Sequence, residues 1–207
     1  MKSLLFLVIS LYISTLYASE EKVLYSQLLV FKEFHDPGWL VSVDDQEYEF
    51  KYEGFTFENI STWKRGRKLL LTYSFDKGIL IHDSKSGTVA HIYHLPTHPI
   101  DIVLEQCLDE RTTTMGMASC YDDASGNWDR EMNRAYQVLK STNSSEVFEA
   151  IQKMQRAWIK YRDNRVVVIR NRYTRDEGTI TIIENSARVL QPIRKQALFL
   201  GSLIKYQ

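Results

Sequence analysis

Long apolar runs are scarce in this sequence, and the one clear example lies at its beginning. Beyond residue 16 no stretch is apolar for the roughly 20 residues that a membrane-spanning helix needs. The run from Leu4 to Leu16 is shorter than that, and it follows the positive Lys2. It leads into Leu16-Tyr17-Ala18 and a polar stretch, which predicts a cleaved signal peptide over residues 1–18 rather than an anchor. The mature chain is therefore expected to be periplasmic or secreted, and not to span a membrane.

Cysteine is also scarce, because Cys107 and Cys120 are the only two. A closely spaced pair in an exported chain favours a disulfide over two reduced thiols, since the compartment is oxidising. Closing a loop of this size stabilises a fold by about 3 kcal/mol in the chain-entropy model. No cysteine lies near the end of the predicted signal peptide, so a lipid anchor is not indicated.

The sequence lacks the motifs of common enzyme classes, including G-x-S-x-G, H-E-x-x-H and the Walker loop. No catalytic residue, metal or cofactor is therefore assigned, and the chain is predicted not to be an enzyme. Three histidines, His91, His94 and His98, invite a metal site. However, His91 and His94 would point to opposite faces of a strand and could not share an ion.

Net charge is absent as well, since 26 basic residues balance 26 acidic ones. This balance, together with export, argues against nucleic acid as a partner. The balance hides an asymmetry: residues 19–105 carry 9 basic and 14 acidic side chains (net −5), and residues 106–207 carry 16 and 12 (net +4). Either the two parts attract each other, or they face different partners.

Short runs rich in β-branched and aromatic residues fill the first part of the mature chain, and turn signals separate them. The expected strands are residues 23–34, 40–43, 48–52, 68–75, 78–82 and 88–93. Their spacing predicts an antiparallel meander or a small barrel within a β-rich domain over residues 19–95. Two prolines then predict a linker over residues 96–106.

Residues 107–207 are predicted to form a helical domain, because apolar residues recur there every three or four positions. The first helix is expected to begin at Ser125 or Asn127, and the second at the cap Asn143-Ser144-Ser145-Glu146. A third stripe surrounds Pro192, which either kinks that helix or helps it begin. The predicted fold class is α+β, with an N-terminal antiparallel β-rich domain followed by an antiparallel three-helix bundle.

Several motifs follow one another in this helical part. Cys107 precedes the run Thr112-Thr113-Thr114-Met115, and Cys120 comes five residues after Met115. The next segments read W-D-R-E-M-N-R-A-Y over residues 128–136 and Q-R-A-W-I-K-Y-R-D over residues 155–163, and Arg194 with Leu198 closes the series. Together they resemble the LprI-type lysozyme-inhibitor family over about residues 107–198. Relatives usually carry a second cysteine pair, and this chain has Val166 and Ser186 or Ala187 at those places.

The motif residues are predicted to be structural rather than to form a ligand site. Three of them share one helical face at spacings of four and three: Asp129, Asn133 and Tyr136. Three others project from the second helix: Gln155, Arg162 and Asp163. Buried polar groups must be hydrogen-bonded, and Asp129 with Arg162 is the expected cross-helix pair. Trp158 and Tyr161 are the expected core anchors.

The resemblance implies an exported non-enzymatic protein that binds a protein partner, namely a lysozyme. Four basic residues beside Trp63 are candidates for target binding: Lys64, Arg65, Arg67 and Lys68. Such a run is also common in solvated turns, and the loop Arg170–Arg175 is an alternative. Two other functions stay open. One is a structural or assembly role in the envelope, through docking of a partner protein; the other is an enzyme of cell-wall glycan, which would need paired carboxylates.

Overall fold

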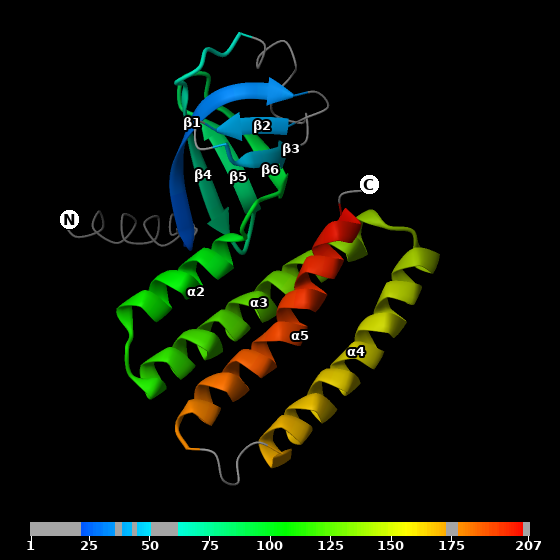
Figure 1. The fold of residues 1–207 in the computed structure, drawn as a ribbon. Coiled ribbons are helices and arrows are strands. Elements are labelled where there is room, and N and C mark those ends of the chain that lie inside the picture. Colours follow the sequence, from blue (N-terminus) through cyan, green and yellow to red (C-terminus); the bar gives the residue numbers. More distant parts are fainter. Residues whose placement is uncertain (1–21, 36–38, 43–44, 51–61, 173–177, 205–207) are drawn as a thin grey trace, which may run out of the picture.

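The structure is a computed structural model that describes residues 22–35, 39–42, 45–50, 62–172 and 178–204. The predicted signal peptide, residues 1–18, lies outside the described residues. A curled sheet forms one end of the molecule and a group of long helices forms the other (Figure 1). The fold class is α+β, as predicted from the sequence.

Six antiparallel strands form the sheet, and they close on themselves in the order β1-β2-β3-β6-β5-β4. Their bounds are β1 (Tyr25–His35), β2 (Trp39–Ser42), β3 (Glu47–Phe50), β4 (Lys68–Ser74), β5 (Gly78–Asp83) and β6 (Thr88–His94). The long strand β1 makes closure possible, because its first half pairs with β4 and its second half pairs with β2. Each predicted strand is present to within about two residues, since alternating side chains and turn residues mark both ends.

In the described part of the chain four helices follow the sheet, rather than the three predicted. They are α2 (Pro99–Glu110), α3 (Thr114–Thr142), α4 (Ser145–Arg172) and α5 (Ile180–Ile204). Most of α2 lies in residues that were predicted to be a linker. Pro99 does not prevent this helix, because it stands in the first helical turn, where a missing N–H costs nothing. The helix α3 begins at Thr114, more than ten residues earlier than predicted, and Thr113 caps it by accepting a hydrogen bond from Gly116 N at 3.1 Å.

Two hydrophobic cores lie in series. The barrel core is built on Leu40, Leu69 and Ile81, and the helical core is built on Trp128, Leu139 and Leu200. One strand residue, Tyr73, belongs to the helical core and is fully buried there. The end of β4 therefore packs into the helices, and the sheet and the helices form one continuous packed structure.

The predicted disulfide between Cys107 and Cys120 is present, with 5.8 Å between the two Cα atoms. It ties the last turns of α2 to the first turns of α3, next to the connection between them. This covalent link compensates for a stretch of α3 that contains Gly116 and Gly126, which are poor helix formers. None of the helices in the described part of the chain combines the length and the apolar character needed to cross a membrane.

Candidate protein-binding site

Trp128 organises the polar contacts inside the helical part. Its ring is fully buried, and its indole N–H donates to Asp101 on α2 at 3.2 Å. Arg194 on α5 reaches the same carboxylate through Nε at 3.0 Å and Nη2 at 2.8 Å. The guanidinium of Arg194 also lies over the Trp128 ring, 5.6 Å from its centre. Trp128 and Arg194 both belong to the motifs found in the sequence, and the structure gives them one shared role: they join α2, α3 and α5.

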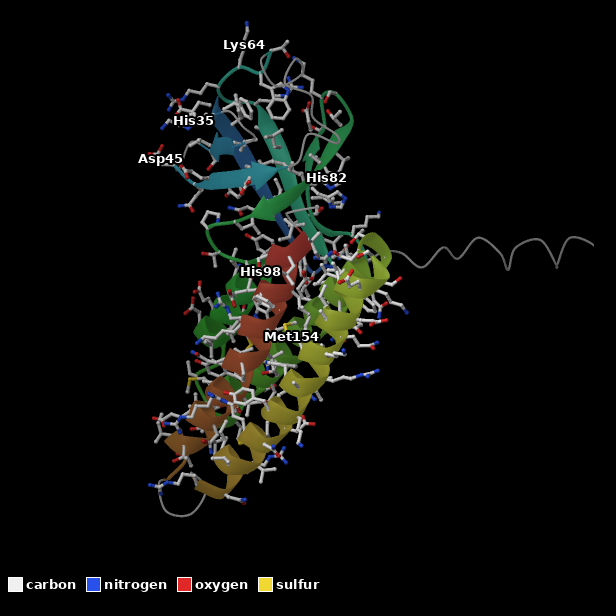
Figure 2. All side chains as sticks on the ribbon, turned by 90° about the vertical axis from the view of Figure 1, so that its right-hand side faces the viewer. His35, Asp45, Lys64, His82, His98 and Met154 are labelled. Carbon is white, nitrogen blue, oxygen red and sulfur yellow. A yellow bond between two sulfur atoms is a disulfide. The ribbon has the colours of Figure 1, made fainter. Side chains whose placement is uncertain are left out.

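His98 lies next to this network, and Figure 2 shows it where the helices meet the sheet. Its ring stacks between Trp128, at 4.4 Å, and Tyr73, at 5.2 Å. Its Nδ1 accepts a hydrogen bond from Ile100 N at 3.2 Å and so caps α2. Burial is the main reason why the pKa of His98 is lowered to about 3, and the charges of Arg134 and Arg194 contribute to the lowering. The imidazole is therefore neutral at physiological pH, with its proton on Nε2.

This arrangement predicts that His98 makes the protein sensitive to mild acid. The pKa of His98 is about 3 when folded and near 6.5 when unfolded, so stability is present above pH 6.5 and declines as the pH falls towards 3. Between pH 6.5 and pH 5 the loss is about 1.5 to 2 kcal/mol. Urea unfolding at a series of pH values measures it. His98→Asn keeps an acceptor for the cap and does not titrate, so its stability should change less over this range; an identical slope would contradict the assignment.

A second set of contacts locks the sheet onto the helices. The hydroxyl of Tyr73 on β4 donates to Glu131 Oε2 on α3 at 2.9 Å. Arg134 holds the same carboxylate with two bonds, at 2.8 and 2.6 Å. Burial is the main cause that raises the pKa of Tyr73, and the nearby charge of Glu131 raises it further. The hydroxyl therefore stays protonated and donates its hydrogen bond. An added Cβ at Gly78, where φ is +74°, would lie 3.2 Å from Arg134 Cζ. The guanidinium thus fits against a strand end that only glycine leaves open.

The motif residues on the outer side of α3 and α4 form a looser, partly exposed cluster. Arg162 Nη1 lies 3.5 Å from Asp129 Oδ1, so the expected cross-helix pair is present but long. The guanidinium is closer to Asp163 Oδ1, at 2.9 Å, and it covers the Trp158 ring at 5.4 Å. Asn133 Nδ2 donates to the Asp129 backbone oxygen at 2.9 Å. Of these contacts only the long Arg162–Asp129 pair joins α3 to α4, and the charged groups are partly exposed to solvent.

The expectation of two core anchors on α4 is wrong for one of them. Trp158 is half-buried and packs against the helical core, but Tyr161 is 53% exposed. Tyr161 lies three residues after Trp158, which places it some 60° round the helix and at the edge of the buried stripe. Its hydroxyl accepts a hydrogen bond from Arg165 Nη1 at 3.1 Å.

The remaining motif residues also serve packing between helices. Gln155 is buried and accepts a hydrogen bond from Gln196 Nε2 on α5 at 2.8 Å. Its amide donates in turn to the sulfur of Met132 on α3 at 3.3 Å. The ring of Tyr136 packs against Phe148, 5.2 Å between centres. Gln155 therefore connects all three long helices.

The four basic residues proposed for target binding do not act alike. Three of them are exposed: Lys64, Arg65 and Lys68. Arg67 instead points back into the protein, where it forms a two-bond ion pair with Asp83 at the end of β5. Its guanidinium also lies 5.1 Å from the Trp63 ring. The prediction that all four cations are available for a target is thus wrong for Arg67, which holds the turn in place.

Asp83 is the buried acidic partner that holds Arg67 in this inward position. Its side chain is completely buried, and it accepts hydrogen bonds from Arg67, from Lys85 N at 3.1 Å and from Ser86 N at 3.2 Å. Burial alone would raise the pKa of this carboxyl, but the hydrogen bonds of Arg67 and Ser86 lower it to about 2. A charged Asp83 therefore holds the β5–β6 turn next to the turn formed by residues 64–67.

Several of these residues were not singled out from the sequence, namely Tyr73, Asp83, Asp101 and Glu131, and His98 was considered only as a metal ligand. Asp101 and His98 begin a helix that was expected to be a linker, so capping was not considered there. Glu131 lies within a recognised motif, but its partner is 58 positions away in the sequence and gives no local signal. In the described part of the chain no group of three or more His, Cys, Asp and Glu side chains is placed to hold a metal ion. Residues 170–172 of the alternative loop Arg170–Arg175 belong to α4 rather than to a loop, and residues 173–175 lie outside the described residues.

Comparison with known proteins gives a family match for part of the chain and similarity to solved structures. Residues 107–200 match the family model described as "Lysozyme inhibitor LprI", so the resemblance expected from the motifs is confirmed for this part. No curated protein matches the chain. A crystal structure of an uncharacterized protein from Burkholderia thailandensis is similar at 31% identity and a TM-score of 0.51, with 53% of this chain and 55% of that chain covered. This chain thus spans about half the length of that protein.

Proposed function

We propose, from the match of residues 107–200 to a lysozyme-inhibitor family, that this chain is an exported protein that binds and inhibits lysozyme-type muramidases. The observation that carries the proposal is that the matched segment is held in one arrangement together with the start of α2. The disulfide, the contacts of Trp128 and Arg194 with Asp101 and the Gln155–Gln196 bond join the helices. A rigid module of this kind suits stoichiometric binding, because little ordering is needed when the partner docks.

Export is part of the same proposal. The Cys107–Cys120 bond is typical of an oxidising compartment, and the sequence predicts a signal peptide before the first strand. A periplasmic or secreted location would place the protein where muramidases attack the cell wall.

The proposal predicts inhibition by the mature protein without any cofactor. Purified protein that begins near residue 19 is expected to slow the lysis of cell walls by at least one of several lysozyme classes, in proportion to its concentration. A turbidity assay measures the rate, and isothermal titration calorimetry with the same enzyme gives the stoichiometry. The same protein unfolded by reduction and alkylation is the control. Absence of both inhibition and binding across the whole panel would overturn the proposal.

A second candidate is docking to another envelope protein, which the opposite net charges of residues 19–105 and 106–207 favour. Affinity capture from envelope extract distinguishes the two functions. A muramidase bound at equimolar ratio supports inhibition. A specific envelope protein retained in the absence of any muramidase binding supports docking.

A further inference from the structure

We infer that the basic turn, residues 64–67 at the end of the barrel, enters the acidic cleft of the target muramidase and presents Lys64 and Arg65 to its carboxylates. This inference rests on the proposed function and adds to it the surface and the charge that recognise the target. It also gives a role to the β-rich part, which the family match does not cover.

The basic turn is held rigidly from both sides. Arg67 N donates to Lys64 O at 3.1 Å, which closes a four-residue turn, and Gly66 N donates to Phe31 O at 2.8 Å. Gly66 has a φ of +93°, which the third position of a type II turn requires and which glycine adopts without strain. Trp63 is buried before the turn and Arg67 is ion-paired after it, so both ends are fixed. Only the side chains of Lys64 and Arg65 remain to project.

Among the described residues around the basic turn, two acidic side chains are already paired with cations. Asp83 is neutralised by Arg67, and Asp45 by Lys32, with a contribution from Arg65 to the lowered pKa of Asp45. The exposed cations that remain lie in or beside two adjacent turns, and they are Lys64, Arg65, Lys68 and Lys85. An acidic partner is therefore the partner that this surface fits.

The position of the turn matches a concave partner. Lys64 lies at the extremity of the barrel, away from the helices (Figure 2). A muramidase carries its two working carboxyl groups inside a cleft, about 5 to 9.5 Å apart. Long cationic side chains on a protruding, preorganised turn can reach both groups, and preorganisation lowers the cost of binding. Burying an ion pair is costly unless its geometry is good. The two-bond Arg67–Asp83 pair meets this condition and fixes the shape of the turn.

Substituting both projecting cations tests the inference. The double variant Lys64→Gln and Arg65→Gln in the mature protein is expected to inhibit at least tenfold more weakly than wild type, and Lys64→Glu with Arg65→Glu more weakly still, because repulsion replaces attraction. The matched control is Lys153→Gln with Arg156→Gln, two exposed cations on α4 that are expected to leave inhibition unchanged. Circular dichroism and urea unfolding establish that every variant is folded.

The cleft itself is tested from the side of the enzyme. A soluble cell-wall oligosaccharide that fills the muramidase cleft is expected to compete with the wild-type protein for binding, and amide replacement of the cleft carboxylates should weaken binding. If wild type inhibits and the turn variants inhibit equally well, the inference is overturned and the proposed function stands. If wild type neither binds nor inhibits any muramidase, the proposed function itself fails and the inference fails with it.

Discussion

Replacing Trp128 by alanine is expected to lower the free energy of unfolding by about 3 to 5 kcal/mol. The ring is fully buried at the centre of the helical core, so its loss leaves a cavity bounded by three helices. The substitution also removes the indole donor to Asp101 and the surface on which His98 and Arg194 stack. Urea unfolding followed by circular dichroism of the helices measures the change.

Trp158→Ala is the matched control for this substitution. Trp158 is half-buried and lies at the edge of the same core, where Arg162 covers one side of its ring. Its removal opens a groove that water can fill, so the expected loss is clearly smaller. The variant Trp128→Phe should fall between the two, because it keeps much of the ring volume and loses the bond to Asp101. Equal losses for Trp128→Ala and Trp158→Ala would show that Trp128 does not organise the core.

The strands could be predicted closely from the sequence because their signals are local. Strand β4 is an example: buried and more exposed side chains alternate from Lys68 to Tyr73, and the turn after Ser74 contains Asp76-Lys77-Gly78. Closure of the sheet was harder to predict from the sequence. It depends on the pairing of β1 with both β2 and β4, and a pairing over 48 positions, such as Tyr25 with Tyr73, leaves no local pattern.

Helical segments with an apolar stripe that faces the core were predicted. The start of α3 was missed, because a disulfide and packing against α2 hold it helical. The start of α4 at Ser145 agrees with the predicted cap Asn143-Ser144-Ser145-Glu146, although Val147 and Tyr161 are exposed. The first turns of α3 contain small and polar residues, and a disulfide and the packing of α2 hold them helical. Pro192 was expected to kink the third helix or to begin it, and it lies well inside α5, which begins at Ile180.

The candidate site was predictable in its residue types and not in its geometry. A run of four cations beside a tryptophan indicates a basic turn, but the sequence cannot tell which cation turns inward. Arg67 does so because Asp83 lies next to it across the barrel end, 16 positions away. One partner at that distance changes Arg67 from a residue available to a target into one that positions Lys64 and Arg65.

Replacing Asp83 by asparagine is expected to lower the free energy of unfolding by about 3 to 5 kcal/mol, because it leaves the guanidinium of Arg67 without its buried counter-charge. Asparagine keeps the size of the side chain but only one acceptor oxygen, whereas Lys85 N donates to Oδ1 and Ser86 N donates to Oδ2, so the loss includes one of these turn bonds as well as the ion pair. The pH dependence should change in parallel. The pKa of Asp83 is about 2 in the folded protein, so wild type gains stability from this group above about pH 4 and loses it as the pH falls towards 2, whereas the variant has nothing to lose there.

A double-mutant cycle with Arg67→Gln separates the ion pair from its surroundings. Removing both charges should cost less than the sum of the two single losses, by about 1.5 kcal/mol or more, because the double variant leaves no buried charge unpaired. Asp45→Asn is the matched control: its ion pair with Lys32 is exposed, and asparagine accepts the positive φ of 62° found there, so no measurable loss is expected. Additive losses in the cycle, or an equal loss for Asp45→Asn, would mean that Asp83 does not fix the basic turn. In that case Lys64 and Arg65 would no longer be held in one orientation, and their fit to a rigid acidic cleft would lose its structural basis.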